Sequence, residues 1–410
     1  MSDESLSRVQ RLRAALTTQH LPCDIWLIVA VVALAGLGWI MVSSASVGLL
    51  ENSYHYSRQH GIFLLLAIVA CLFMLCVPLE LWRQNAALIL LVSIFMLVVV
   101  LVIGQEVNGS KRWISLPGPL PSLQVSELAK VGLIFYMAAF MSRFTYELRR
   151  QAFTMWRPLA VLAVPASLLF LAPDFGGMVV YAVCVIGMLM MSGASLTLLL
   201  GSGSVLGVGA VMMVVMEPYR LARWTSFLDP WADQFATGYQ LTQALIAFGR
   251  GHVTGTGLGN SVQKLHYLPE AHTDFIFAVV AEELGMIGAI LVVLLFTLFI
   301  VRAMWVGRRA ELAGHLFGAY VSYGIGFIVA AQALINMAVS SGLLPTKGLT
   351  LPLISYGGSS LLVTGMMIGL LLRVDAETRH RPRQTKGQTM KIMVGPEMMT
   401  GIFQSCVRTR

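Results

Sequence analysis

The stretch from residue 85 to residue 104 reads NAALILLVSIFMLVVVLVIG and contains no charged side chain. As an α-helix, a run of this length rises about 30 Å, which is the thickness of the hydrocarbon core of a bilayer. The apolar positions are continuous and do not alternate with polar ones. The stretch therefore predicts a transmembrane helix and not a strand of a membrane β-barrel.

Apolar stretches of the same kind recur along the chain. Of its 410 residues, 57% are hydrophobic and 12% are charged, and the mean hydropathy is +0.77, whereas an average soluble domain has about 25% charged residues. A soluble globular protein is therefore excluded, and we expect an all-α polytopic integral membrane protein with about ten transmembrane helices. The predicted spans are residues 25–43, 61–77, 85–104, 125–142, 158–172, 175–192, 196–216, 275–301, 315–338 and 350–372.

The distribution of Lys and Arg predicts the orientation of these helices. With a cytoplasmic N-terminus, 19 of the 28 basic residues fall on the cytoplasmic side and eight on the outer side, and Lys130 falls within a span. This asymmetry places both termini in the cytoplasm. The net charge of +8 is then explained by topology and by attraction to anionic lipid, and no nucleic-acid-binding motif accompanies it. The expected organisation is a cytoplasmic arm at 1–23, a transmembrane domain at 24–380 and a cytoplasmic tail at 381–410.

One connection is much longer than the others. Residues 217–274, between the seventh and eighth predicted helices, form an outer loop that mixes charged, aromatic and glycine residues. Loops of this length are functional or disordered, and the clustered aromatic residues favour short amphipathic helices on the membrane surface. The glycines between residues 249 and 259 lack the preceding strand and the spacing of a nucleotide loop, so a hinge or a close backbone approach is favoured. His266, His272 and Asp274 lack the spacing of a structural zinc site.

Ionisable residues within or beside the predicted spans are informative, because they are costly there unless paired or hydrated. Glu127 and Lys130 lie three residues apart and share a helix face; a structural pair and the lining of a polar cavity both remain open. Glu282 and Glu283 lie roughly 12 Å deeper than Asp274, and at least one of them is expected to face a cavity or a basic partner such as Lys130. For Asp274, the residues alone support a helix N-cap and a catalytic base of raised pKa equally.

The last predicted span begins irregularly. Residues 344–360 read LPTKGLTLPLISYGGSS, so prolines, glycines and hydroxyl residues stand where a regular helix would start. Backbone of this kind at membrane depth must be buried in protein or line water. Gly357 and Gly358 are typical of close helix packing, and Lys347 at the outer mouth is best explained by an anionic ligand.

Several motifs together resemble the SEDS family of polytopic cell-wall polymerases (shape, elongation, division and sporulation), over about residues 24–380. A Pro-Thr-Lys-Gly sequence before Leu-Pro-Leu, and an alanine before His-Thr-Asp, resemble the division branch of the family more than the elongation branch. Val125, Phe175 and Gly177 depart from the commoner family pattern, but the changes conserve shape. The motifs are NGSKRWI at 108–114, QVSELAK at 124–130, PDFG at 173–176, YLPEAHTDFIF at 267–277, EELG at 282–285 and the stretch 345–360.

The resemblance implies a peptidoglycan glycosyltransferase that polymerises lipid II into β-1,4-linked glycan strands at the outer face of the cytoplasmic membrane during septal cell-wall synthesis. Asp274 matches the family's essential aspartate, which favours the catalytic base over the cap. It would take a proton from the 4-hydroxyl of the acceptor GlcNAc as that oxygen attacks the anomeric carbon of the donor MurNAc with inversion. Undecaprenyl pyrophosphate leaves as a stable anion, so no protonating acid is needed, unlike in glycosidases.

The resemblance also implies contacts to the substrate. Cations are expected to stabilise the leaving pyrophosphate, and a divalent cation, Mg²⁺ or Mn²⁺, bound to that pyrophosphate is the one cofactor considered. No nucleotide, haem or flavin is expected, and no metal site is assigned. The expected substrate-binding residues are the outer cations Arg112, Arg223, Lys264 and Lys347, together with Trp113, Glu127, Lys130, His272, Glu282, Glu283 and Ser355.

Partners and alternatives follow from the same resemblance. Lipid II, membrane lipids, a class B penicillin-binding protein transpeptidase (FtsI-like) and other division proteins are the expected partners, at the division septum of the inner membrane. A lipid II flippase stays open, because a polar cavity with Glu127 and Lys130 would suit passage of a headgroup. An elongation-branch polymerase and a scaffold that only positions the transpeptidase also stay open.

Overall fold

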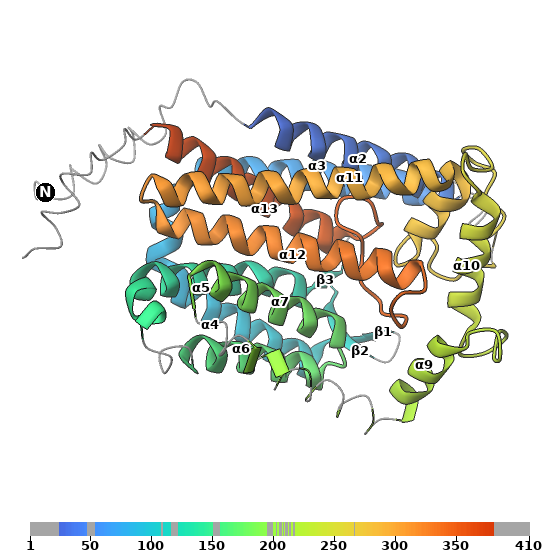
Figure 1. The fold of residues 1–410 in the computed structure, drawn as a ribbon, viewed down its shortest axis with the longest axis horizontal. Helices are drawn as coiled ribbons and strands as arrows, with labels where there is room; N and C mark the ends of the chain where they lie inside the picture. The colour runs from blue at the N-terminus through green and yellow to red at the C-terminus, as the bar shows by residue number, and fades with distance from the viewer. Residues whose placement is uncertain are drawn as a thin grey trace, which may run out of the picture.

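The protein forms a bundle of long helices that run side by side, with one small β-sheet at an end of the bundle (Figure 1). The computed structural model describes residues 24–46, 54–107, 110–115, 122–150, 156–194, 218–265 and 267–380, with isolated positions between 200 and 215. The predicted terminal arm and tail lie outside the described residues, and so does much of the predicted span 196–216.

Nine helices of the structure coincide with predicted spans. Among the described residues, seven helices are long and apolar enough to cross a membrane, and α6 and α7 are shorter apolar helices. The predicted all-α multi-pass membrane fold is confirmed, while the number of ten spans stays a prediction. The nine helices are α2 (Ile25–Ala45), α3 (His55–Cys76), α4 (Leu79–Ile103), α5 (Val125–Arg150), α6 (Trp156–Leu171), α7 (Phe175–Met191), α11 (Ile276–Leu312), α12 (Leu316–Ser340) and α13 (Gly358–His380).

Large apolar side chains cover the outside of this bundle. Leu65 on α3 and Leu91 and Val102 on α4 are more than 60% exposed. A soluble monomer rarely exposes apolar surface on this scale, whereas a lipid-facing surface requires it. α12 and α13 lie mostly inside the bundle, and their polar residues face other helices and not lipid.

Small residues allow a close contact between two of the helices, α3 and α13. On α13, a Cβ atom placed on Gly365 would lie 2.3 Å from the carbonyl oxygen of Ala67 on α3, and one on Gly369 would lie 2.2 Å from that of Cys71. Both distances are far inside van der Waals contact, so only glycine allows the two backbones to approach this closely. Such small-residue seams are how membrane helices gain packing energy without a hydrophobic driving force.

A small antiparallel sheet replaces part of a predicted loop. It contains β1 (Gln105–Val107), β2 (Ser110–Ile114) and β3 (Leu123–Gln124) in the order β1-β2-β3. Trp113 is paired with Gln105 on one side and with Gln124 on the other. The prediction contained no strand, although the Asn-Gly pair between β1 and β2 in the sequence is a common hairpin signal.

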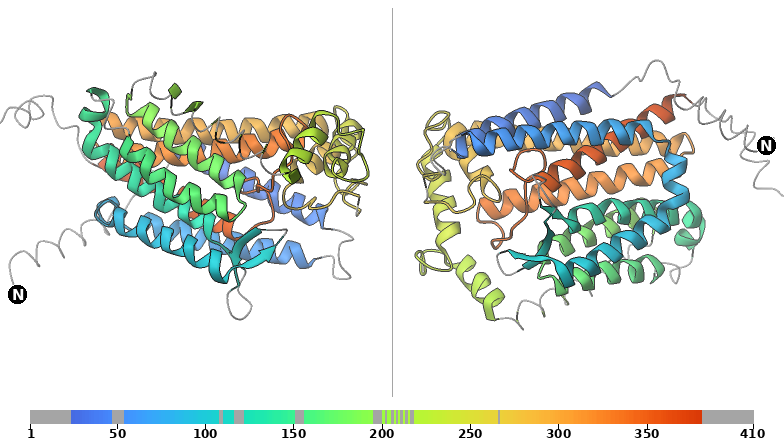
Figure 2. Two further views of the ribbon diagram at one scale, coloured as in Figure 1. Left: turned by 90° about the horizontal axis from the view of Figure 1, so that it is seen from below. Right: turned by 180° about the vertical axis from the view of Figure 1, so that it is seen from behind.

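Short helices were expected in the predicted long outer loop, and the structure has two there, α9 (Pro218–Leu228) and α10 (Tyr239–Gly251). They lie at the same end of the bundle as the sheet, as seen in two further directions in Figure 2. Residues 341–357, between α12 and α13, are without regular structure, as the prolines and glycines predicted. We call this end of the bundle the loop end.

Candidate active site

Asp274 lies at the loop end, in the turn immediately before α11. Its backbone carbonyl accepts a hydrogen bond of 2.8 Å from the Nδ2 atom of Asn336 on α12. Asn336 also donates to the carbonyl of Leu349, at 2.6 Å, so one amide links the Asp274 turn to the irregular segment 341–357. Gly348 of that segment faces the carboxylate, because a Cβ atom there would lie 3.1 Å from Oδ2 of Asp274.

The surroundings of Asp274 change its acidity. Burial, and to a lesser extent the negative charge of Glu270, raise the pKa of Asp274 to about 7, while the positive charges of Arg112 and Arg223 oppose that shift. A carboxylate of ordinary pKa is a weak base at neutral pH, whereas one near 7 is matched to the task of taking a proton. Asp274 therefore has the acidity of a general base.

Three of the predicted cations lie around the same turn. Arg112 on β2 pairs with Asp174, with 3.3 Å between Nη1 and Oδ1, and its Nε atom is buried without a hydrogen-bond partner among the described residues. Arg223 on α9 donates to the carbonyl of Thr346, with Nη1 and the oxygen 3.5 Å apart. The Lys347 ammonium lies 4.3 Å from the centroid of the Phe175 ring. Three of the four cations expected at the outer face thus lie near this turn, and the fourth, Lys264, lies elsewhere.

The segment 341–357 is tied directly to the Asp274 turn. The Ser355 hydroxyl donates to the carbonyl of Thr273 at 2.6 Å and accepts a bond of 2.8 Å from the backbone N–H of Leu351. The backbone N–H of Tyr356 donates to the carbonyl of His272 at 2.9 Å. Ser355 was predicted to bind substrate. In the structure its hydroxyl group donates its hydrogen bond to the backbone and so helps to position the turn.

Two tyrosine rings pack against His272, which is close to Asp274 in the sequence. The His272 ring lies 4.7 Å from that of Tyr56 and 5.6 Å from that of Tyr356, measured between centroids. Burial lowers the pKa of His272, so its neutral form is favoured. Nδ1 of His272 is buried without a partner among the described residues. The predicted residue Trp113 lies on β2, beside Arg112 and half-buried.

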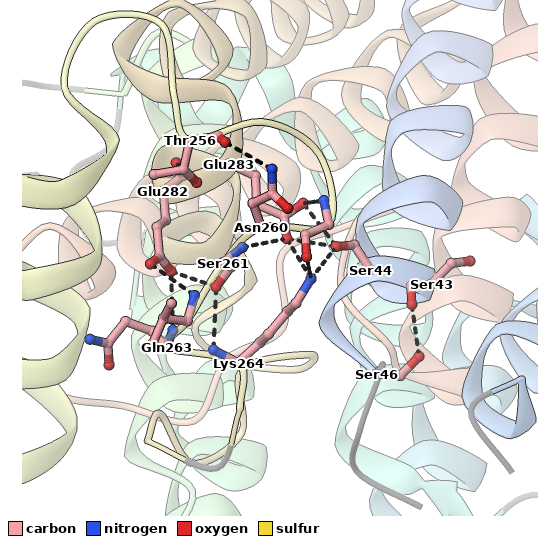
Figure 3. Close-up of polar contacts among 12 residues, drawn as sticks. Ser43, Ser44, Ser46, Thr256, Asn260, Ser261, Gln263, Lys264, Glu282 and Glu283 are labelled. Carbon is pink, nitrogen blue, oxygen red and sulfur yellow. Dashed lines mark hydrogen bonds and ion pairs between the residues drawn. The ribbon is translucent and has the colours of Figure 1, made fainter.

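Glu283 and Lys264 are brought together in a separate, buried cluster (Figure 3). Lys264 Nζ lies 2.8 Å from Oε1 of Glu283, 2.9 Å from the Ser44 hydroxyl and 2.8 Å from the Gly259 carbonyl. The Ser44 hydroxyl lies 2.6 and 2.8 Å from the two carboxylate oxygens of Glu283. Glu283 and Lys264 are at most 2% exposed. The sequence suggested that Glu282 or Glu283 faces a cavity or a basic partner such as Lys130. In the structure, the basic partner of Glu283 is Lys264.

Glu282 is held by the same loop. Its carboxylate accepts bonds from the Ser261 hydroxyl at 2.5 Å and from the backbone N–H of Val262 at 3.1 Å. Arg250 on α10 lies 3.6 Å away, between Nε and Oε1. Lys264, Glu282 and Glu283 thus fix the loop to α11 and lie apart from the cations around Asp274.

A crossing of two backbones accompanies this cluster. α11 is interrupted at Gly285, where φ is 68°, so the N–H groups of Met286 and Ile287 do not reach the carbonyls of Glu282 and Glu283. Loop residues 252–257 replace both missing bonds. Two loop carbonyls accept hydrogen bonds from the N–H groups of Met286 and Ile287, at 3.0 and 3.2 Å. Two loop N–H groups donate to the carbonyls of Glu282 and Glu283, at 2.9 and 3.0 Å. The glycine-rich stretch is therefore a site of close backbone approach, one of the two uses the sequence favoured.

Glu127 and Lys130 form the structural pair that was one of the two predicted interpretations. Their Oε1 and Nζ atoms are 2.5 Å apart, and both residues are under 5% exposed. Gln332 on α12 donates to the same Glu127 oxygen at 3.5 Å. The pair links α5 to α12 inside the bundle.

Three residues of the site, Asn336, Tyr56 and Tyr356, were assigned no role from the sequence. Asn336 holds the Asp274 turn, and its position inside an apolar span was a signal that could have found it. Tyr56 and Tyr356 flank His272, but aromatic residues near a membrane surface carry no comparable signal. Within the described part of the chain, no three His, Cys, Asp or Glu side chains lie close enough together to hold a metal ion.

Comparisons with known proteins agree with this architecture. Residues 25–380 match the model of a family described as "Cell cycle protein". The chain is 56% identical to the probable peptidoglycan glycosyltransferase FtsW of Halomonas elongata, over 92% of this chain and 97% of that protein. It is 46% identical to the protein of the same name from Coxiella burnetii, over 87% and 97%.

Two solved structures resemble the fold. One is a chain from work on the structural coordination of polymerization and crosslinking by a peptidoglycan synthase complex, with a TM-score of 0.73, 27% identity, and coverage of 88% of this chain and all of that one. The other is the rod shape determining protein RodA of Thermus thermophilus, with a TM-score of 0.66, 25% identity, and coverage of 89% and 100%.

Proposed function

This chain belongs to the cell cycle protein family matched by residues 25–380, which is the SEDS family of its motifs, and we propose that it is a peptidoglycan glycosyltransferase. Its relatives named as such are similar over nearly their whole length. The proposed reaction is the polymerisation of lipid II into β-1,4-linked glycan strands.

The observation that carries the proposal is the state of the Asp274 carboxyl group. It is half-buried at the loop end, its pKa is raised to about 7, and the positive charges of Arg112 and Arg223 act on it. A base of this acidity beside a group of cations suits a reaction that removes a proton from one sugar and releases a pyrophosphate from another. The loop end is also the side that the distribution of Lys and Arg predicts to face outward.

The proposed chemical step uses Asp274 as the general base. Its carboxylate takes the proton of the acceptor GlcNAc 4-hydroxyl while that oxygen forms a bond to the anomeric carbon of the donor MurNAc. The bond from that carbon to the pyrophosphate oxygen breaks, and undecaprenyl pyrophosphate leaves with the electron pair. Attack from the face opposite the leaving group converts an α-linked donor into a β-1,4 bond.

Arg112 and Lys347 are the proposed contacts of the leaving pyrophosphate, and Arg223 supports the segment that carries Lys347. The Nη1 atom of Arg112 pairs with Asp174 and its Nε atom is buried, so the guanidinium group is held in place and can present its remaining exposed edge to an anion without first breaking that pair. Since the described residues form no metal-binding group, we place a divalent cation on the substrate pyrophosphate itself, where it would neutralise charge.

The biological setting is proposed from the relatives and motifs. We infer that the enzyme acts at the division septum, together with a class B penicillin-binding protein transpeptidase. The division branch is supported by the FtsW-named relatives, and the partner by the likeness to a chain of a peptidoglycan synthase complex.

Polymerisation of labelled lipid II by the purified protein tests the proposal. The assay is run for the wild type and for Asp274→Asn, each with and without the transpeptidase. We expect the variant to lose at least a hundredfold in rate, since a general base contributes about 10² to 10⁴. Glycan strands of undiminished amount from Asp274→Asn would show that the base is elsewhere. Transport of lipid II across vesicles without polymerisation would favour the flippase.

A further inference from the structure

A second site lies at the end of the bundle opposite Asp274. A cavity of about 920 Å³, open to the surroundings on one side, is lined by the first turns of α4, the last part of α5, the start of α12 and the end of α13. Its basic residues Arg83 and Arg143 are among those that predict the cytoplasmic side of the membrane. The cavity therefore lies at the predicted inner membrane surface, and none of the residues assigned to the proposed reaction lines it.

The charges around the cavity leave one arginine unmatched. Of the two carboxylates in its wall, Glu80 is 2.7 Å from Arg83, and Glu377 is 2.7 Å from Arg373. Arg143 is exposed and takes part in none of the ion pairs among the described residues. Its guanidinium group lies 5.4 Å from the centroid of the neighbouring Phe144 ring. The charge left over is positive, so the wall favours an anion.

The part of the wall beside Arg143, on the same helix, is apolar. Along α5, the rings of Tyr136 and Phe140 are stacked at 6.5 Å, and those of Phe140 and Phe144 lie 4.9 Å apart. All three residues line the cavity. A free inorganic anion would contact only the guanidinium group, whereas an amphipathic anion would contact both the guanidinium group and this aromatic wall.

We propose that this cavity binds the headgroup of an anionic glycerophospholipid from the inner leaflet. The phosphate contacts the Arg143 guanidinium, and the upper part of an acyl chain lies against Tyr136 and Phe140.

Photo-crosslinking of the full-length protein in detergent tests the proposal, with a phosphatidylglycerol probe that carries a photoreactive group near the headgroup. Mass spectrometry is expected to map the crosslinks to peptides containing residues 79–87 and 136–144. Unlabelled phosphatidylglycerol should compete with the probe, while phosphatidylcholine and inorganic phosphate at the same concentration should not. Arg143→Gln should reduce crosslinking about fivefold, since one basic residue near an anionic membrane surface contributes about that factor to binding.

The matched control is Arg308→Gln. Arg308 is also basic and exposed, and it lies near the same end of the bundle on α11, but it is paired with Glu311 at 2.8 Å and does not line the cavity. This variant should crosslink as the wild type does. Equal competition by phosphatidylcholine would overturn the preference for an anion. Competition by inorganic phosphate would identify a free-anion site, and an unchanged Arg143→Gln would remove the residue on which the proposal rests.

Discussion

Replacing Lys264 with methionine is the most direct test of how the loop end is held together. The substitution keeps the length and the apolar stem of the side chain but removes the ammonium group. Glu283 would then stay buried, at most 2% exposed, with its charge unmatched. Breaking a buried ion pair by removing one partner costs about 3–5 kcal/mol.

The local structure narrows that range. After the substitution, Glu283 keeps the Ser44 hydroxyl at 2.6 Å and the backbone N–H groups of Gly259 and Ser261 at 3.1 and 3.4 Å. These neutral donors continue to solvate the carboxylate, so we expect a loss near the lower limit, about 3 kcal/mol. The double variant Lys264→Met/Glu283→Gln removes both charges and should recover a large part of that loss.

Equilibrium unfolding in mixed micelles with increasing SDS, followed by tryptophan fluorescence, measures the difference. Lys111→Met is the matched control, because Lys111 is exposed on β2, and its free energy of unfolding should stay within about 0.5 kcal/mol of the wild type. The reasoning is refuted if Lys264→Met is as stable as this control, or if the double variant is less stable than the single one.

Three further predictions concern the site and the bundle. The rate of wild-type polymerisation should rise with pH through about 7, as Asp274 loses its proton. Arg112→Gln removes a positive charge that lowers the pKa of Asp274, so its pH–rate profile should shift to higher pH. Lys111→Gln should leave the profile in place. Gly348→Ala puts a methyl group about 3.1 Å from the carboxylate and should lower kcat more than it changes protein stability, as single-turnover rates and SDS unfolding would show. Gly365→Val forces α3 and α13 apart and should cost about 1–3 kcal/mol in the same unfolding experiment.

The seven long apolar helices among the described residues were predictable from sequence because a single physical requirement, an apolar run about 30 Å long, fixes each of them. The α11 span shows the limit of that reasoning, since the helix continues to Leu312 beyond the predicted end at residue 301. Beyond the hydrocarbon core a helix can continue through polar residues, and hydropathy does not reveal that part of the helix. The sheet was missed for a related reason, because three short strands carry little periodicity.

Several side chains of the candidate site could be named from sequence, but their grouping could not. Asp274, Arg112 and Lys347 were expected at the outer face and lie around one turn. Lys264 was grouped with them because the sequence indicates on which side of the membrane Lys264 lies, but not how deeply its side chain is buried in the protein. Its hydroxyl partner Ser44 is 220 positions away along the chain, and no local pattern encodes a contact of that range.

The crossing at Gly285 has a consequence for how the protein is made. Two hydrogen bonds that α11 would normally form within itself are supplied by loop residues 252–257, and backbone groups left unsatisfied inside a bilayer cost several kcal/mol each. α11 is therefore unable to adopt its final conformation as an independently inserted helix. Biogenesis requires the preceding loop to fold back onto the helix during or after insertion, which makes this crossing an obligatory step of assembly.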